Sequence, residues 1–121
     1  MAKLIYLASP YTHPDAAVRE RRFLAAAIAV GIMAQRGELA LSPIAHSHHA
    51  ATLCGMGLDW RAWQRLDLEQ LRRCDALAVL TLPGWELSVG VRAEIAAARK
   101  MDKPVTYRRG LANAAWRKSG E

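Results

Sequence analysis

Residues 76–94 of this chain read ALAVLTLPGWELSVGVRAE, and an Ala-rich segment follows them as far as Met101. The short apolar run before the Pro-Gly turn predicts a buried strand, and the segment from Ser88 onward predicts a helix. At the start of a helix the free backbone N–H groups point outward, so a hydroxyl and a small residue there suit an anion. Ser88, Gly90 and Glu94, about one turn further in, are therefore the first candidate site residues.

The same alternation of apolar and helical segments continues over the rest of the chain. Strands are expected at residues 3–8, 38–42, 76–82 and 103–107. Long helices are expected at residues 16–35, 59–73 and 88–101. Strands that alternate with helices of this length predict an α/β protein. We expect a single-domain Rossmann/flavodoxin-like three-layer sandwich with a mainly parallel sheet of four to five strands.

Capping residues mark several of the expected boundaries. Asp15 or Thr12 is expected to cap the first long helix, Gly37 to end it, and Asp59 to cap the second. Residues 44–58 are the least regular part of the chain. Residues 111–116 are expected to form a short helix, after which the chain end frays.

Composition limits the class of protein. With 121 residues, 52% of them hydrophobic, the chain is expected to be one domain, and no apolar run is long enough to span a membrane. The start of the chain lacks the apolar core of a signal peptide, and Cys54 and Cys74 form neither a disulfide framework nor a zinc motif. We therefore expect a reduced, cytoplasmic protein without a cofactor.

The net charge of +6 raises the question of nucleic-acid binding. The basic residues are dispersed, however, and no aromatic residues interleave with them in a stacking pattern. The sequence therefore does not favour a nucleic-acid partner. A small anionic substrate accounts for the charge equally well.

In a parallel α/β sheet the ligand lies at the carboxyl ends of the strands. That rule brings residues 9–13, 43–49 and 83–94 into one crevice. Binding roles are expected there for Ser9, His13 and His46 toward substrate or phosphate, and for Trp85 as a platform for a nucleobase.

Several motifs together resemble the nucleoside 2-deoxyribosyltransferase superfamily. They are found in this order along the chain: Ile5-Tyr-Leu-Ala-Ser-Pro-Tyr11, Asp67-Leu68, Cys74-Asp-Ala76, Leu82-Pro-Gly-Trp-Glu86, Ser88-x-Gly-x-x-x-Glu94 and Lys103-Pro-Val105. The chain looks most like a small branch described only as a domain of unknown function, related to the deoxynucleoside 5′-monophosphate N-glycosidases. The resemblance assigns residues 1–107 to this domain and leaves residues 108–121 as a basic tail.

The resemblance implies a role for each matching residue. Glu94 would be the nucleophile that attacks the anomeric carbon, with Tyr6 orienting it. Ser88 would bind a 5′-hydroxyl or 5′-phosphate, and Asp67 would lie on the side of the base. The implied partners are a nucleoside or nucleotide and further copies of this chain, as a homodimer or higher homo-oligomer.

The residue types suit this chemistry. Cleavage of a C–N glycosidic bond passes through an oxocarbenium-like state, which a carboxylate stabilises or captures covalently. Asp67 could give the departing base a proton if burial raised its pKa. Structural alternatives remain open: Glu94 as a solvated helix residue, Asp67 as a surface acid, Ser88 as a helix cap only and Tyr6 as a core residue.

Two further groups of residues have competing interpretations. The histidines His46, His48 and His49 lack the partner ligands of a zinc site, and the last two are expected to face solvent. Trp60 and Trp63, one helical turn apart, indicate packing or a subunit interface.

The sequence therefore predicts an N-glycosidase or deoxyribosyltransferase acting on a nucleoside or its 5′-monophosphate. The alternative is a non-catalytic module that binds or senses a nucleotide in the same crevice. A basic nucleic-acid-binding protein is the least favoured possibility.

Overall fold

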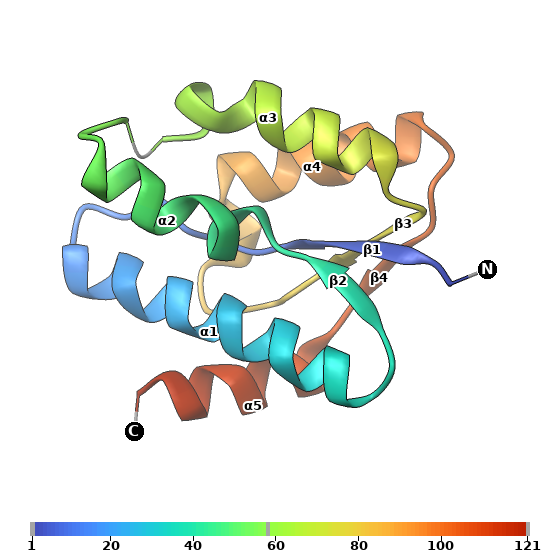
Figure 1. The fold of residues 1–121 in the computed structure, drawn as a ribbon, viewed down its shortest axis with the longest axis horizontal. Helices are drawn as coiled ribbons and strands as arrows, with labels where there is room; N and C mark the ends of the chain where they lie inside the picture. Colours follow the sequence, from blue (N-terminus) through green and yellow to red (C-terminus); the bar gives the residue numbers. More distant parts are fainter. Residues whose placement is uncertain (1, 58, 121) are drawn as a thin grey trace.

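The computed structural model describes residues 2–57 and 59–120. Three residues lie outside the described residues. They are Met1 at the start of the expected domain, Leu58 at the end of the expected irregular segment and Glu121 at the end of the expected tail. The sheet consists of β1 (Leu4–Ala8), β2 (Leu39–Leu41), β3 (Ala76–Val79) and β4 (Val105–Tyr107). The strands are all parallel, in the order β2-β1-β3-β4 (Figure 1).

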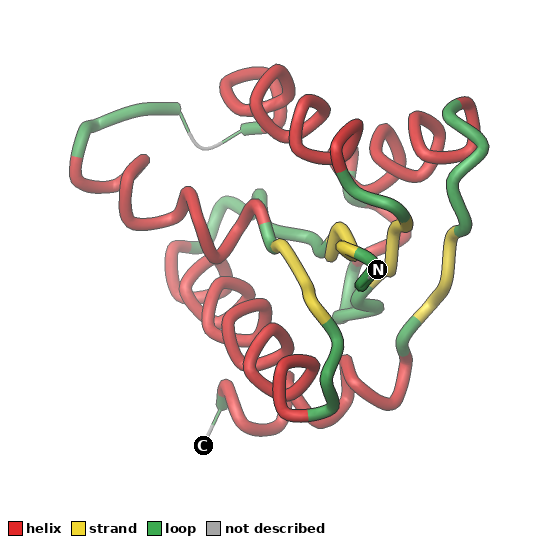
Figure 2. The backbone as a smooth tube through the Cα atoms, turned by 45° about the vertical axis from the view of Figure 1, so that its right-hand side comes forward, coloured by secondary structure: helices red, strands yellow, loops and turns green. Residues whose placement is uncertain are grey.

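Five α-helices in the described ranges surround this sheet, and four of them pack on its two faces (Figure 2). On one face, α1 (Ala16–Gln35) and α5 (Arg109–Ser119) contribute Ala29 and Leu111 to a core that includes Leu7 of β1. On the other, α3 (Trp60–Arg73) and α4 (Val89–Lys100) pack over Tyr6 of β1 and Leu77 of β3. Successive residues of a strand point to opposite faces, which is why Tyr6 and Leu7 enter different cores. The protein is thus a Rossmann/flavodoxin-like three-layer α/β domain.

The expected start signals act at three of the helices. Asp15 caps α1 by accepting a hydrogen bond from the backbone N–H of Ala17 at 2.9 Å, and Asp59 caps α3 in the same way from Ala62 at 3.1 Å. Ser88 caps α4. Each cap satisfies a backbone donor that has no partner within its own helix. The bounds of α1 and α3 in the structure confirm the predicted ranges, and the caps explain where both helices begin.

The expectation of an irregular segment at 44–58 was wrong for most of its length. Residues Pro43–Leu53 form a regular helix, α2, beyond the end of β2 and alongside α1 (Figure 1). Ser42 caps it by accepting from the N–H of Ala45 at 3.0 Å, and proline suits the first helical position because its missing N–H would be unpaired there.

The C-terminal helix is longer than expected. It spans residues 109–119 rather than 111–116, and Leu111, Ala112 and Ala115 are buried in the core against α1. Arg21 of α1 lies 3.8 Å from the centre of the Trp116 ring and donates a hydrogen bond to the Trp116 carbonyl. These contacts hold the segment against the domain. None of the helices in the described ranges is long and apolar enough to cross a membrane.

Candidate active site

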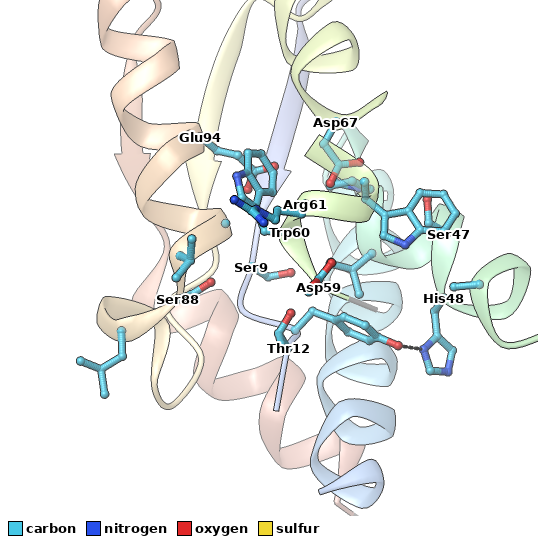
Figure 3. Close-up of a pocket in the computed structure, with 18 residues that line it drawn as sticks. Ser9, Thr12, Ser47, His48, Asp59, Trp60, Arg61, Asp67, Ser88 and Glu94 are labelled. Carbon is cyan, nitrogen blue, oxygen red and sulfur yellow. Dashed lines mark hydrogen bonds between the residues drawn. The ribbon is translucent and has the colours of Figure 1, made fainter. Parts of the chain in front are cut away.

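A cavity of about 460 Å³ opens at the carboxyl ends of the strands, between α2, α3 and the start of α4 (Figure 3). The segments after β1, β2 and β3 all contribute to it, as expected for a parallel sheet. Its lining combines aromatic rings, hydroxyl groups and two buried carboxyl groups. The lining includes Ser9, Tyr11, His48, Trp60, Trp63, Asp67, Ser88, Gly90 and Glu94.

Glu94 of α4 lies in the wall of this cavity and is only 4% exposed. The hydroxyl of Tyr6, a fully buried residue of β1, donates a hydrogen bond to its carboxylate. Burial raises the pKa of Glu94 to about 8, since a charge is costly away from water; the Tyr6 hydrogen bond opposes this rise and nearby Asp67 adds to it. Glu94 is therefore a dry, oriented carboxyl group rather than a solvated helix residue.

Asp67 of α3 is the second buried carboxyl group and is 6% exposed. Burial raises its pKa to about 7. Its Oδ1 has no hydrogen-bond partner within the described part of the chain, and neither has the buried hydroxyl of Ser9, which also lines the cavity. Buried polar atoms are normally paired, so these two atoms offer hydrogen-bonding positions to a polar group in the cavity. The interpretation of Asp67 as an ordinary surface acid is wrong.

The start of α4 forms another part of the wall. The Ser88 hydroxyl accepts a hydrogen bond from the Val91 N–H at 3.2 Å, so it acts as a helix cap, and the residue also faces the cavity. Gly90 lies under the ring of Trp60. A Cβ atom on Gly90 would come within 3.2 Å of Trp60 Cε3, so glycine lets α3 and α4 approach closely at this point.

The structure exchanges the places predicted for the tryptophans in the cavity and in the core. Trp60 and Trp63 of α3 line the cavity, where Trp63 Nε1 donates to the Gly57 carbonyl at 2.7 Å. Trp85 does not line it. Trp85 lies in the 3₁₀ turn Trp85–Leu87, packs against the core below α4, and its ring centre is 5.6 Å from that of Tyr107. The flat apolar walls of the cavity thus come from the helix whose tryptophans were expected to serve packing or a subunit interface.

The structure places three of the four histidines differently from the sequence prediction. His13 and His46 are absent from the cavity lining: His13 Nδ1 accepts from the backbone N–H of Asp15, and His46 pairs with its neighbour Ser47. His48 was expected to face solvent, yet it is buried and lines the cavity together with Tyr11. The helical path of α2 explains this change, because it turns His48 inward and leaves His46 on another face.

One sequence signal places the residues of this wall on a common helical face. Ile44, Ser47, His48 and Ala51 all line the cavity, and their spacing of three and four residues is that of one helical face. The signal needed the recognition of Ser42-Pro43 as a helix start. Tyr11 lies in the loop after β1, which the strand-end rule had already placed at the crevice.

No three histidine, cysteine or acidic side chains within residues 2–57 and 59–120 are grouped so as to hold a metal ion. Cys54 is exposed, Cys74 is buried, and both are free cysteines. The expected homo-oligomer and the cytoplasmic location stay predictions.

A parallel sheet in the order β2-β1-β3-β4, with a cavity at its carboxyl edge, defines a Rossmann-like α/β domain. Residues 3–109 match the family described as a domain of unknown function, DUF1937, and the chain belongs to that family. The match includes all four strands and the first four α-helices. No curated protein matches the chain.

Proposed function

We propose that this protein cleaves the base–sugar bond of a nucleoside or nucleoside 5′-monophosphate, with Glu94 as the nucleophile. The observation that carries the proposal is the buried Glu94 carboxyl group, held at the cavity wall by the Tyr6 hydroxyl and accompanied by a second buried acid, Asp67. The proposal also extends the resemblance to the nucleoside 2-deoxyribosyltransferase superfamily, whose motifs include these three residues.

The electrostatics of the two acids favour a reaction that develops positive charge. Burial raises the pKa of both groups, so each exchanges a proton near neutral pH, and a positive charge beside them favours their ionised forms. An oxocarbenium-like sugar supplies that positive charge only in the transition state. Interactions that strengthen in the transition state are those that accelerate a reaction.

The proposed steps divide the work between the two carboxyl groups. Ionised Glu94 attacks C1′, the C–N bond breaks, and its electron pair goes to the base nitrogen, which takes a proton from Asp67. Water or a second free base then attacks C1′ and displaces Glu94. The attacking molecule gives its proton to Asp67. The Tyr6 hydroxyl stabilises the ionised form of Glu94 at the start and end of this cycle.

The remaining groups fit the parts of a nucleotide. Ser88 and the start of α4 offer a hydroxyl and a helix N-terminus to a 5′-hydroxyl or 5′-phosphate, away from the two acids. The rings of Trp60 and Trp63 offer apolar surface to a base.

The direct test is to incubate the purified protein with ribo- and deoxyribonucleosides and their 5′-monophosphates and to measure free base by chromatography. We expect release by the wild-type protein and none by Glu94→Gln. The matched control is Glu86→Gln, on an exposed residue outside the cavity lining, which should release base normally. Retained release by Glu94→Gln would reject the proposal. A second free base in the mixture separates transfer, which forms a new nucleoside, from hydrolysis.

One observation favours a second function, a module that binds a nucleotide without cleaving it. Burial raises the pKa of Glu94 to about 8, and a protonated carboxyl group cannot attack a sugar carbon. In that case the nucleotide would stabilise the protein against unfolding and be recovered intact after long incubation, with the same result for wild type and Glu94→Gln.

A further inference from the structure

The cavity ends at a hydrogen-bonded chain of three side chains that the proposed reaction does not use. The Tyr11 hydroxyl lies 2.6 Å from His48 Nδ1, and His48 Nε2 lies 2.8 Å from Glu20 Oε2. His48 is 9% exposed, whereas Glu20 of α1 is 53% exposed at the surface. Tyr11 and His48 also line a second hollow with Glu20 and Arg19, so they form the partition between the cavity and that outer hollow.

Packing holds the imidazole in one orientation. The ring of Phe23 stacks on His48 with centres 4.2 Å apart and planes 17° apart, and the Tyr11 ring meets it edge-on at 5.5 Å. A ring packed in this way between α1, α2 and the loop after β1 cannot exchange its two nitrogens by rotation without leaving its contacts. Each nitrogen therefore keeps its own partner.

The Glu20 carboxylate sets the direction of one of these hydrogen bonds, and a neutral imidazole sets that of the other. A carboxylate only accepts, so the Nε2 of His48 carries the proton that it donates to Glu20. The other nitrogen of a neutral imidazole is then bare and accepts the proton of the Tyr11 hydroxyl. Burial raises the pKa of Tyr11, although Arg19 opposes the rise, so the phenol keeps that proton to donate. Toward the cavity, the Tyr11 oxygen is left with lone pairs only.

His48 and Glu94 lie at opposite ends of the cavity (Figure 3). If the anomeric carbon of a nucleoside meets Glu94, as in the proposed function on which this inference rests, the base extends toward the Tyr11 end. We propose that the Tyr11 hydroxyl accepts a hydrogen bond from an exocyclic amino group of the base, so that the cavity selects amino-bearing nucleobases. His48 and Glu20 are positioning residues that keep Tyr11 an acceptor.

The binding test compares ligands that differ only in the amino group: 2′-deoxyadenosine against purine 2′-deoxyriboside, and 2′-deoxycytidine against 2-pyrimidinone 2′-deoxyriboside, each also as its 5′-monophosphate. The titrations use Glu94→Gln, in which the ligand stays intact. In at least one pair, we expect the amino compound to bind about 10-fold more tightly, the effect of one hydrogen bond to a desolvated acceptor. Adding Tyr11→Phe should reduce that ratio to about 1 and leave the affinity of the amino-free compound nearly unchanged.

Matched variants separate this role from a structural one. Tyr107→Phe removes an exposed hydroxyl outside the cavity and should leave the ratio as it is. Glu20→Gln should lower the ratio, whereas Glu86→Gln should not. Ring ¹⁵N NMR of His48 gives a readout independent of any ligand: we expect a protonated Nε2 and a bare Nδ1, and a mixture of tautomers in Glu20→Gln.

Three outcomes would overturn the inference. The role of Tyr11 is rejected by equal binding within both pairs, or by a preference that survives Tyr11→Phe. In either case the proposed function still stands if wild type releases base and Glu94→Gln does not. A protonated Nδ1 in wild-type His48 rejects the acceptor role directly. Absence of binding by every nucleoside and nucleotide, together with absence of base release, rejects the proposed function and this inference with it.

Discussion

Tyr6 and Glu94 are 88 positions apart in the chain and form one buried pair. Burial raises the pKa of the Tyr6 phenol far above its ordinary value, and the charge of Glu94 raises it further, so Tyr6 stays protonated and donates. The same hydrogen bond favours the ionised form of Glu94, the form that a nucleophile needs. The two groups therefore act as a unit in the proposed reaction.

Tyr6→Phe tests that unit. Without the hydrogen bond, the pKa of Glu94 rises further, so less Glu94 is ionised while Asp67 is still protonated, and the pH optimum of base release should move upward. At pH 7 the rate should fall about 10-fold. The measurement is the pH profile of base release beside that of Tyr107→Phe, which should match wild type. An unshifted profile, or a shift to lower pH, would contradict the assigned role of Tyr6.

Asp67 links the site to stability. Its pKa is about 7 in the folded protein against an ordinary value of 3.8, so the folded protein binds more protons than the unfolded chain between these values. The free energy of unfolding therefore falls as the pH rises through this window, and Glu94 adds to the fall between 4.5 and about 8.

Asp67→Asn removes one of these two costs. At pH 8 the variant should unfold about 5 °C above wild type, and the difference should nearly vanish at pH 4, where Asp67 is protonated in the folded protein. Thermal unfolding across this pH range measures the effect, with Glu86→Gln as the control. Parallel curves for Asp67→Asn and wild type would show that ionised Asp67 costs the fold nothing. Base release by Asp67→Asn should fall about 10²–10⁴-fold, the usual contribution of a general acid.

At the scale of elements, the approach of α3 to α4 shapes the aromatic wall of the cavity. Gly90, the second residue of α4, lies against the Trp60 ring at a distance that leaves little room for a methyl group. The position of that ring therefore depends on a single small residue of the neighbouring helix.

Gly90→Ala should displace the Trp60 ring by a few tenths of an ångström and weaken nucleoside binding several-fold. Stability should change little, because the helix propensity of alanine offsets the closer contact by about 1 kcal/mol. Calorimetric titration and chemical unfolding measure the two effects. Gly110→Ala is the matched control, since Gly110 is also the second residue of its helix and has open space around its Cα. Unchanged affinity in Gly90→Ala would mean that the Trp60 ring does not contact the ligand.

Helix α2 shows which features of a helix its own sequence predicts and which depend on packing. Its start signal, Ser42 before Pro43, acts within three residues and was available in the sequence. The direction in which His48 points was not available, since it depends on the packing of α2 against α1. Stacking on Phe23 and the bond to Glu20, 28 positions away, decide it.

At the scale of the whole molecule, one buried cation joins two loops at the carboxyl edge of the sheet. Arg22 of α1 is almost fully buried and donates to the carbonyl oxygens of Thr12, at 2.9 Å, and Pro83, at 3.1 Å. Gly84 adopts a positive φ of 86° beside it, and a Cβ there would come within 2.8 Å of the guanidinium. The loops after β1 and β3, which carry parts of the cavity wall, are thereby tied to the same helix.

Arg22→Met keeps the apolar stem and removes these hydrogen bonds. We expect a loss of about 3 kcal/mol in the free energy of unfolding, because two loop carbonyl groups lose a charged donor. Chemical denaturation measures the loss, with Arg117→Met, on an exposed residue of α5, as the control. A loss equal to that of the control would mean that the loops hold their positions without Arg22.

The order and type of most elements, their caps, the parallel sheet and the candidacy of Glu94 and Ser88 follow from local patterns, whereas the candidacy of Asp67 came from the family resemblance. Hydrophobic period and capping act over a few residues, so they are legible in a sequence. Which tryptophan and which histidine line the cavity was decided only in three dimensions. Trp85 turns into the core while Trp60 and Trp63 face the cavity, and His48 meets Tyr11 across 37 positions of chain. Such contacts depend on the face of the sheet on which each helix packs, and no local pattern carries that information.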